Sequence, residues 1–291
     1  MPMKITTLFI PLFFCATNIF CQVNAPVSDS SKPFVLGVTE QIRSSQLNEI
    51  RTINIYFPEG YNKNDTTRYP VIYLLDGGAD EDFIHIAGLV QFSSFPWVMR
   101  LPKSIVVGIA NVNRMSDFTY PTLVDEDKKR YPFSGQSDKF IAFIEKELQP
   151  FVARKYKANG TKTLIGESLG GLLATEILLK KTYLFNKYII VSPSLWWDNA
   201  SLLTLQSDIY RENFPGKADI FIGVGKEGLG PTTTPHNMVD EARALSEKLK
   251  ASKSKNVKVY FDYIPEETHA TISHQAVYDA FKQLYAPPAG K

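Results

Sequence analysis

The stretch Thr163-Leu164-Ile165-Gly166-Glu167-Ser168-Leu169-Gly170-Gly171-Leu172-Leu173-Ala174 is the most informative part of the 291-residue chain. It reads as a short apolar strand, then Gly-x-Ser-x-Gly, then a helix rich in Leu and Ala, which is the sequence form of a nucleophile elbow. The small residues around Ser168 let the strand and the helix approach each other closely. The serine hydroxyl then stands clear of the sheet. An ordinary Gly-rich turn with an incidental serine is the alternative, but both flanks match what the elbow requires.

Strands alternate with helices along the rest of the chain, which argues for a mostly parallel sheet with helices on both faces. Two segments that alternate apolar and polar residues, 39–44 and 50–57, are expected to pair as an antiparallel edge. Continuous apolar runs at 70–75 and 104–110 are typical of buried central strands. The remaining expected strands are 163–165, 188–192, 218–224 and 257–264. The expected helices are 138–156, 170–180, 239–251 and 272–284.

The first 25 residues read as a secretory signal peptide, because a short positive start precedes an apolar stretch and a small-residue cleavage pattern. The apolar stretch is shorter than the about 20 residues that a membrane helix needs. Both cysteines, Cys15 and Cys21, lie in this segment, so cleavage after Ala25 would leave no thiol for a disulfide, a thiol enzyme or a metal. We expect an exported protein, periplasmic or extracellular, with no integral membrane segment after cleavage. Lipid anchoring at Cys21 is the less favoured alternative.

Three further segments follow the signal peptide. Residues 26–34 are expected to form a flexible leader, 35–286 the catalytic domain and 287–291 a tail. The formal net charge of +2 falls to +1 when Lys4 is removed with the signal peptide. Because no basic run and no stripe of arginine and aromatic residues is present, nucleic acid is not an expected partner.

A nucleophilic serine needs a base, and in this type of fold the base follows the last strand. Two of the four histidines do so. His269 lies in the expected loop 265–270, whereas His274 falls at the start of the final helix, where packing would fix it. His269 is therefore the predicted base. His85 precedes the elbow and His236 lies in a segment rich in Thr and Pro, so both are poorer candidates.

The acid that orients the base is expected after the strand 218–224, where Glu227 is the best placed carboxylate. Its task is to hold the imidazole tautomer and to stabilise the imidazolium that forms. Asp198, a water molecule and a bare Ser–His pair are the alternatives. An oxyanion hole needs two N–H groups, one expected from Leu169 and the other from the turn 75–79, at the end of a central strand.

With these features the chain resembles the putative esterase family of α/β-hydrolases. That family includes esterase D, mycolyltransferases, feruloyl and acetyl-xylan esterases and siderophore esterases. The matching stretches are Tyr73–Gly77, Val107–Asn111 with Arg114 and Asp117–Thr119, Phe140–Pro150 and Ser192–Asp198. The resemblance covers roughly residues 39–284. It implies an α/β-hydrolase fold with a mostly parallel central sheet, helices on both faces and no large cap domain.

The resemblance also implies ester hydrolysis through an acyl-enzyme, without a metal or an organic cofactor. Ser168 would be the nucleophile and His269 the base, while Glu227 fits the family's acid position less closely. Leu169 and Gly78 would donate to the oxyanion.

Substrate contacts are expected from three side chains that follow strand ends. Arg114 would pair with a carboxylate or catecholate oxygen. Trp196 and Trp197 would stack on a catechol, a feruloyl ring or a sugar, with core packing of a short loop as the alternative. Glu167 departs from the family, in which relatives usually have His before the serine. Its side chain is expected to point away from the substrate, while its carboxylate near the elbow would disfavour anionic substrates.

The expected partner is a small-molecule or oligosaccharide ester. Segment 192–198 is most typical of the siderophore-esterase branch, so the predicted substrate is an enterobactin-like siderophore ester. Feruloyl or acetyl groups on polysaccharide are the alternative substrates. A non-catalytic binding protein on a hydrolase scaffold is the rival class, because a scaffold alone does not prove a function.

Overall fold

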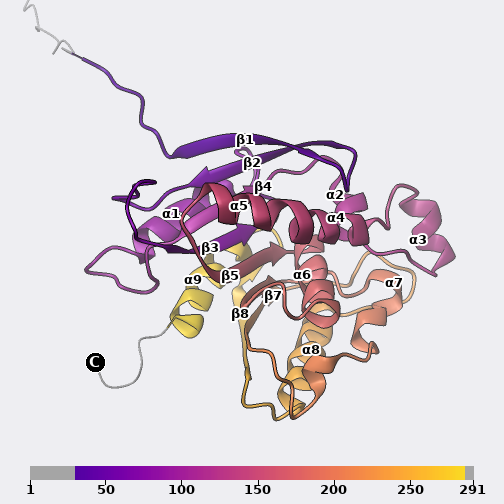
Figure 1. Ribbon diagram of the computed structural model, residues 1–291. Coiled ribbons are helices and arrows are strands. Elements are labelled where there is room, and N and C mark those ends of the chain that lie inside the picture. Colours follow the sequence, from indigo (N-terminus) through magenta and orange to yellow (C-terminus); the bar gives the residue numbers. More distant parts are fainter. Residues whose placement is uncertain (1–29, 286–291) are drawn as a thin grey trace, which may run out of the picture. The chain divides into compact units, whose positions relative to one another are not determined.

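In residues 30–285, the part of the chain that the computed structural model describes, eight strands form one sheet (Figure 1). Their order is β1-β2-β4-β3-β5-β6-β7-β8. The strands are β1 (Gly37–Ser44), β2 (Glu49–Tyr56), β3 (Tyr69–Leu74), β4 (Ile105–Ile109), β5 (Ala158–Glu167), β6 (Lys187–Val191), β7 (Ala218–Lys226) and β8 (Val257–Thr268). β2 pairs antiparallel with β1 and β4, and the other neighbours are parallel. The expected antiparallel edge and mostly parallel sheet are confirmed.

The central strands are apolar along their whole length because both faces of the sheet are covered. Along β3, Val71 and Tyr73 belong to the core on one face, while Ile72 and Leu74 belong to the core on the other. All four are buried. The uninterrupted apolar run that predicted this strand therefore reflects burial on two sides.

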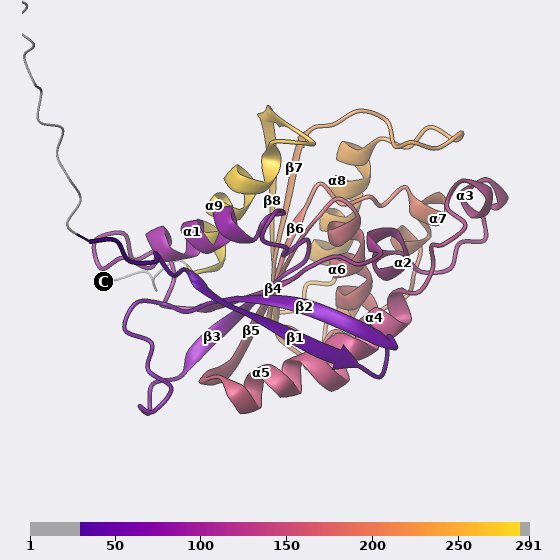
Figure 2. The same cartoon turned by 90° about the horizontal axis from the view of Figure 1, so that it is seen from above.

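Helices form a layer on each face of the sheet (Figure 2). α1 (Phe83–Ser93) and α9 (Ile272–Leu284) pack on one face. The other face is covered by α4 (Ser137–Phe143), α5 (Gln149–Lys155), α6 (Leu169–Lys180) and α8 (Met238–Ala251). Shorter helical elements in the loops are α2 (Arg114–Phe118), α3 (Asp125–Arg130), α7 (Trp197–Ala200) and the 3₁₀ turns η2 (Ser201–Leu203) and η3 (Asp208–Tyr210). Because only α7, η2 and η3 lie between β6 and β7, no large cap domain is inserted there.

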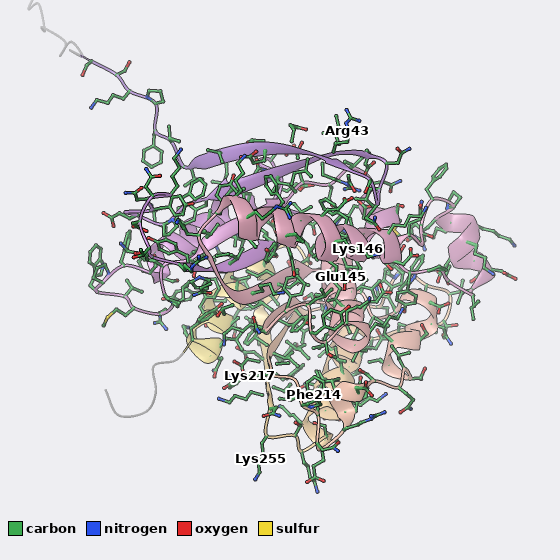
Figure 3. The ribbon with its side chains drawn as sticks, in the orientation of Figure 1. Arg43, Glu145, Lys146, Phe214, Lys217 and Lys255 are labelled. Carbon is green, nitrogen blue, oxygen red and sulfur yellow. The ribbon has the colours of Figure 1, made fainter. Side chains whose placement is uncertain are left out.

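The single helix expected over 138–156 is interrupted by a π-helical turn, η1 (Ile144–Leu148), between α4 and α5. The N–H of Gln149 donates to the carbonyl of Ile144, five residues back. Pro150 explains the wider turn, since it has no N–H and its ring would clash with the carbonyl four residues earlier in an α-helix. The buried face still continues through the turn, while Lys146 points to solvent (Figure 3).

The last strand is longer than predicted. β8 continues to Thr268, where it pairs with Lys226 of β7, so most of the segment expected as a loop after Ile264 is strand. His269 consequently follows directly on the end of β8. The register shifts between Ile264, which pairs with Gly225, and Thr268, so residues 265–267, with Pro265 and two glutamates, form an irregular stretch within β8.

Several sequence-based predictions lie outside the described residues. These are the signal peptide of residues 1–25 with Cys15 and Cys21, the first part of the leader and the tail 287–291. Between residues 30 and 285, no helix combines the length and the apolar character needed to cross a membrane.

A buried ion pair holds α2 against the sheet. Arg51 of β2 is 1% exposed, and its Nη2 lies 2.7 Å from Oδ2 of Asp117 in α2. Arg51 also pairs with Glu49, and its guanidinium lies over the ring of Phe140. Burial raises the pKa of Asp117, and the positive charge of Arg51 opposes that rise. The pair therefore fixes the short helix that begins at Arg114.

We expect Arg51→Ala to lower the free energy of unfolding by about 3–5 kcal/mol at pH 7, because it leaves the Asp117 carboxylate buried without a partner. The loss should shrink on acidification, since a protonated Asp117 carries no charge to bury. Urea denaturation at pH 5 and pH 7 measures both effects. The double variant Arg51→Met/Asp117→Leu is the control and should recover much of the stability. A loss below 1 kcal/mol at pH 7 for Arg51→Ala would contradict this account.

Candidate active site

Ser168 occupies the tight turn between β5 and α6. Its backbone has φ 57° and ψ −116°, a conformation that residues with side chains rarely adopt. The turn is held because the N–H of Ser168 donates to the carbonyl of Val191 and its carbonyl accepts from the N–H of Ser194, both at 3.0 Å. Gly166 is required beside it, since a Cβ there would lie 2.3 Å from the carbonyl oxygen of Gly170. The strand, turn and helix expected around Ser168 are all present.

Side chains from three strand ends meet at this turn. His269 directly follows β8, and its Nε2 lies 2.9 Å from Oγ of Ser168. Its Nδ1 lies 2.8 Å from Oε2 of Glu227, which directly follows β7. The carboxyl ends of parallel strands meet at one edge of a sheet, which is why residues 101 positions apart come into contact. The structure thus brings together the three residues that the sequence proposes as nucleophile, base and acid.

Glu227 is buried and fully engaged in hydrogen bonds. Its side chain is 1% exposed, and its second oxygen, Oε1, accepts a hydrogen bond from the Ser192 hydroxyl. Burial pushes the pKa of Glu227 upward, but the hydrogen bonds from His269 and Ser192 outweigh it and hold the pKa below its usual value. Glu227 is therefore ionised at neutral pH, as an acid that orients an imidazole must be.

The hydrogen bond with Glu227 raises the pKa of His269, against the opposing effect of burial, and the negative charge of Glu167 adds to the rise. A raised pKa means that the imidazole becomes neutral, and so able to accept a proton, only above its usual range.

Two serines of the site were not singled out from the sequence. Ser192 binds Glu227, and Oγ of Ser194 lies 3.3 Å from Oγ of Ser168. Both belong to the Ser-Pro-Ser stretch that directly follows β6. The position of this stretch at the end of a central strand is the sequence signal that could have identified them.

The alternative acid, Asp198, lies elsewhere. Its Oδ1 accepts hydrogen bonds from the Thr122 hydroxyl and the Leu123 N–H, which ties the loop after α2 to α7. Asp198 therefore has a structural role, and the place for an acid beside His269 is filled by Glu227.

The other three histidines do not contact Ser168. His236 pairs with Glu241, with Nδ1 and Oε1 2.5 Å apart. The rings of His85 and His274 stack with their centroids 5.7 Å apart in the wall of the cavity described below. Within residues 30–285, no group of three or more His, Cys, Asp or Glu side chains is placed to hold a metal ion.

The two expected oxyanion donors differ. The N–H of Leu169, the first residue of α6, has no hydrogen-bond acceptor among the described residues. The N–H of Gly78 donates to Oε2 of Glu81 at 2.7 Å. The turn is where the sequence places it, at the end of β3, but the carboxylate three residues on already occupies the Gly78 N–H.

A cavity of about 490 Å³ opens beside Ser168 and His269, and Arg114 and Glu167 line it. Arg114 faces the cavity as expected, but its guanidinium is already paired with Asp76, with Nε 2.6 Å from Oδ1 and Nη2 2.9 Å from Oδ2. A substrate anion would therefore have to compete with Asp76 for this cation.

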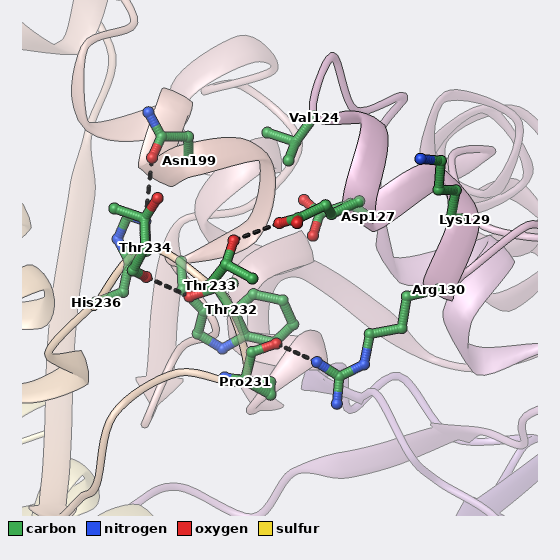
Figure 4. A pocket seen from close by; sticks show the side chains of 12 residues that line it. Val124, Asp127, Lys129, Arg130, Asn199, Pro231, Thr232, Thr233, Thr234 and His236 are labelled. Atoms are coloured by element: carbon green, nitrogen blue, oxygen red, sulfur yellow. Dashed lines mark hydrogen bonds between the residues drawn. The ribbon is translucent and has the colours of Figure 1, made fainter.

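The prediction that Trp197 contacts substrate is wrong. The side chain is 0% exposed, and its Nε1–H donates to the carbonyl of Tyr120, so it belongs to the core. Trp196 lines a separate cavity of about 380 Å³, between α3 and the loop after β7 (Figure 4). Arg130 donates to the carbonyl of Pro231 across this cavity.

The family model described as putative esterase matches residues 44–275, well over half of the chain. A curated relative, the ferri-bacillibactin esterase BesA of Bacillus subtilis, is 28% identical over 267 residues, which cover 84% of this chain and 88% of the relative. Two solved structures are also similar. An IroE-like serine hydrolase from Shewanella oneidensis is 32% identical with a TM-score of 0.74, covering 86% of this chain and 80% of that chain. The BES protein from Bacillus cereus is 27% identical with a TM-score of 0.76, covering 91% and 100%.

We expect Glu227→Gln to lower the pKa of His269, because the carboxylate hydrogen bond is the main cause that raises it. NMR titration of the imidazole measures this shift directly. The acid limb of the pH–rate profile should move to lower pH, while the maximal kcat/KM falls by on the order of 10³–10⁴-fold. Glu241→Gln, which removes the partner of His236, is the control and should leave the titration of His269 unchanged. An unaltered His269 titration in Glu227→Gln would contradict the coupling.

Proposed function

The chain belongs to the putative esterase family, and we propose that it hydrolyses siderophore esters through a serine-bound acyl intermediate. As a member of this family it is a carboxylic ester hydrolase. The hydrogen-bonded path from Ser168 through His269 to Glu227, at the wall of a cavity, supports the serine mechanism.

In the proposed acylation step, Oγ of Ser168 attacks the ester carbonyl carbon while Nε2 of His269 takes the hydroxyl proton. Glu227 stays ionised at Nδ1 and stabilises the imidazolium. The tetrahedral intermediate collapses by breaking the bond to the alkoxy oxygen, which leaves as the alcohol with the proton from Nε2. Water then attacks the acyl carbon and gives its proton to His269. The bond to Ser168 breaks, the carboxylic acid leaves and the proton returns to Oγ.

The oxyanion would be stabilised by the free N–H of Leu169. For Gly78 to act as the second donor, its N–H must exchange the Glu81 carboxylate for the oxyanion. One such donor contributes on the order of 3 kcal/mol to transition-state stabilisation. The exchange replaces one charge-assisted hydrogen bond of the Gly78 N–H with another.

The siderophore part of the proposal draws on the relative named as a ferri-bacillibactin esterase and on the likeness to an IroE-like serine hydrolase. The short loops around the site agree with a bulky substrate, because only α7, η2 and η3 lie between β6 and β7. Removal of feruloyl or acetyl groups from polysaccharide is the alternative function, and a comparison of substrates distinguishes it from siderophore hydrolysis.

We propose that the Trp196 cavity takes a part of the substrate that lies away from the reacting ester. Trp196 is two residues from Ser194, so the Cα atoms of these two residues are at most about 7 Å apart. Ser194 in turn contacts Ser168. Beside it, Asp198, Asn199 and Ala200 all have positive φ, between 51° and 56°. Such strained backbone is concentrated at ligand sites. Asn199 also binds His236 across the cavity wall (Figure 4).

Export is also proposed. The charged start, apolar stretch and small-residue pattern of residues 1–25 support a cleaved signal peptide. An exported esterase would meet its ester substrate in the periplasm or outside the cell.

We expect Ser168→Ala and His269→Ala each to lower kcat/KM for p-nitrophenyl butyrate by on the order of 10⁴–10⁶-fold, because either change removes the nucleophile–base pair. A fluorophosphonate probe should label wild-type protein and spare Ser168→Ala. Ser94→Ala, which removes a hydroxyl at the end of α1, is the matched control and should keep both activities. Wild-type protein that neither labels nor hydrolyses the ester would refute the serine mechanism and favour a binding protein.

We expect a kcat/KM at least 100-fold higher for enterobactin-type or bacillibactin-type triesters than for feruloylated arabinose or acetylated xylo-oligosaccharides. Mass spectrometry of the products, with iron-free and ferric forms compared, identifies the bond that breaks. The reason is that a multi-armed ester can fill both the cavity at Ser168 and the Trp196 cavity. A higher kcat/KM for the carbohydrate esters would contradict the siderophore proposal and support removal of feruloyl or acetyl groups from polysaccharide.

A further inference from the structure

Glu167, the residue before the nucleophile, contacts the reacting groups without taking part in the path from Ser168 to Glu227. Its Oε1 lies 3.4 Å from Nε2 of His269, and its Oε2 lies 3.9 Å from Nη2 of Arg114. The side chain is 19% exposed, and Oε1 makes no hydrogen bond within the described residues. This buried carboxylate oxygen therefore lies beside the imidazole nitrogen that contacts Ser168.

Every element around the cavity contributes charged or titratable groups. The loop before α1 and α1 itself contribute Asp82 and His85, α2 contributes Arg114, and the chain from β8 into α9 contributes His269 and His274. Together with Glu167, the cavity wall therefore holds two carboxylates, three histidines and one permanent cation.

The permanent cation is not free. Asp76 binds the guanidinium of Arg114 through both oxygens, and Asn111 donates both to Asp76 and to Glu81 behind it. The carboxylates near the nucleophile thus outnumber the available positive charge, so an anion entering the cavity meets net repulsion from them.

Given the catalytic roles proposed for Ser168 and His269, on which this inference rests, we propose that Glu167 is a specificity-determining residue. It selects esters whose group in the cavity is uncharged or cationic, and it discriminates against esters that carry a carboxylate there. The discrimination acts through charge, because Glu167 offers no free donor to an anion when it is ionised.

The state of Glu167 makes this discrimination depend on pH. Burial raises the pKa of Glu167 to about 7, with His269 and Arg114 pulling in the opposite direction. Glu167 is therefore neutral below that value and anionic above it, so discrimination should grow from pH 6 to pH 8. His85 and His274 face the same cavity. A variant of Glu167 separates its contribution from theirs.

Two matched pairs of esters test the proposal, one for each half of the substrate. p-Nitrophenyl hexanoate and p-nitrophenyl hemiadipate differ by a carboxylate on the acyl chain. 3-Carbamoylphenyl butyrate and 3-carboxyphenyl butyrate differ by a carboxylate on the leaving group. At pH 8 we expect wild-type protein to prefer the uncharged member of at least one pair by tenfold or more in kcat/KM. The pair with the larger ratio shows which half of the ester lies beside Glu167.

Glu167→Gln should lower that ratio at least fivefold and remove most of its rise from pH 6 to pH 8. Glu167→Asp keeps the charge and should keep the preference, which separates a charge effect from a packing effect. Glu145→Gln removes the same charge from η1 and should leave the ratio as it is (Figure 3). A ratio within twofold of wild type in Glu167→Gln for both pairs would overturn the proposal. If wild-type protein hydrolyses none of the four esters, the catalytic roles fail, and this inference fails with them.

Discussion

The left-handed turn at Ser168 is the constraint on which the rest of the site depends. A serine at φ 57° is unfavourable alone, so the conformation persists only because surrounding groups determine it. Val191 and Ser194 hold its N–H and carbonyl from the neighbouring strand and the loop after it, and Gly166 lets β5 and α6 come together. The hydroxyl is thereby presented at the sheet edge where β7 and β8 also end.

Two glutamates at His269 illustrate how environment separates chemically identical groups. Glu227 is buried but receives hydrogen bonds at both oxygens, so its charge is stabilised. Glu167 is largely buried and its Oε1 accepts no hydrogen bond from the described residues, so its charge is disfavoured and its pKa is raised. One carboxylate is therefore a permanent anion beside Nδ1, and the other changes charge near neutral pH beside Nε2. In active sites, the environments of two carboxylates commonly make their pKa values differ in this way.

The sequence predicts what local pattern and strand order determine. The elbow, the sheet and the meeting of Ser168, Glu227 and His269 follow from positions at strand ends. It does not predict what depends on partners distant in the chain. The length of β8 depends on pairing with β7, and the burial of Trp197 depends on the carbonyl of Tyr120. A motif places a residue near a site, but only packing decides which way its side chain faces.

The same limit applies to the cations and N–H groups at the rim. From the sequence, the Arg114 guanidinium and the Gly78 N–H are predicted to be available to bind a substrate. In the structure they belong to one network, in which Asn111 joins the carboxylate on Arg114 to the carboxylate on the Gly78 N–H. Arg114 is itself held in place by α2, which Arg51 anchors from β2. A charged group at one point of this network therefore changes the field at the other points, so the selectivity proposed for Glu167 depends on the charges of Asp76, Glu81 and Arg114 as well.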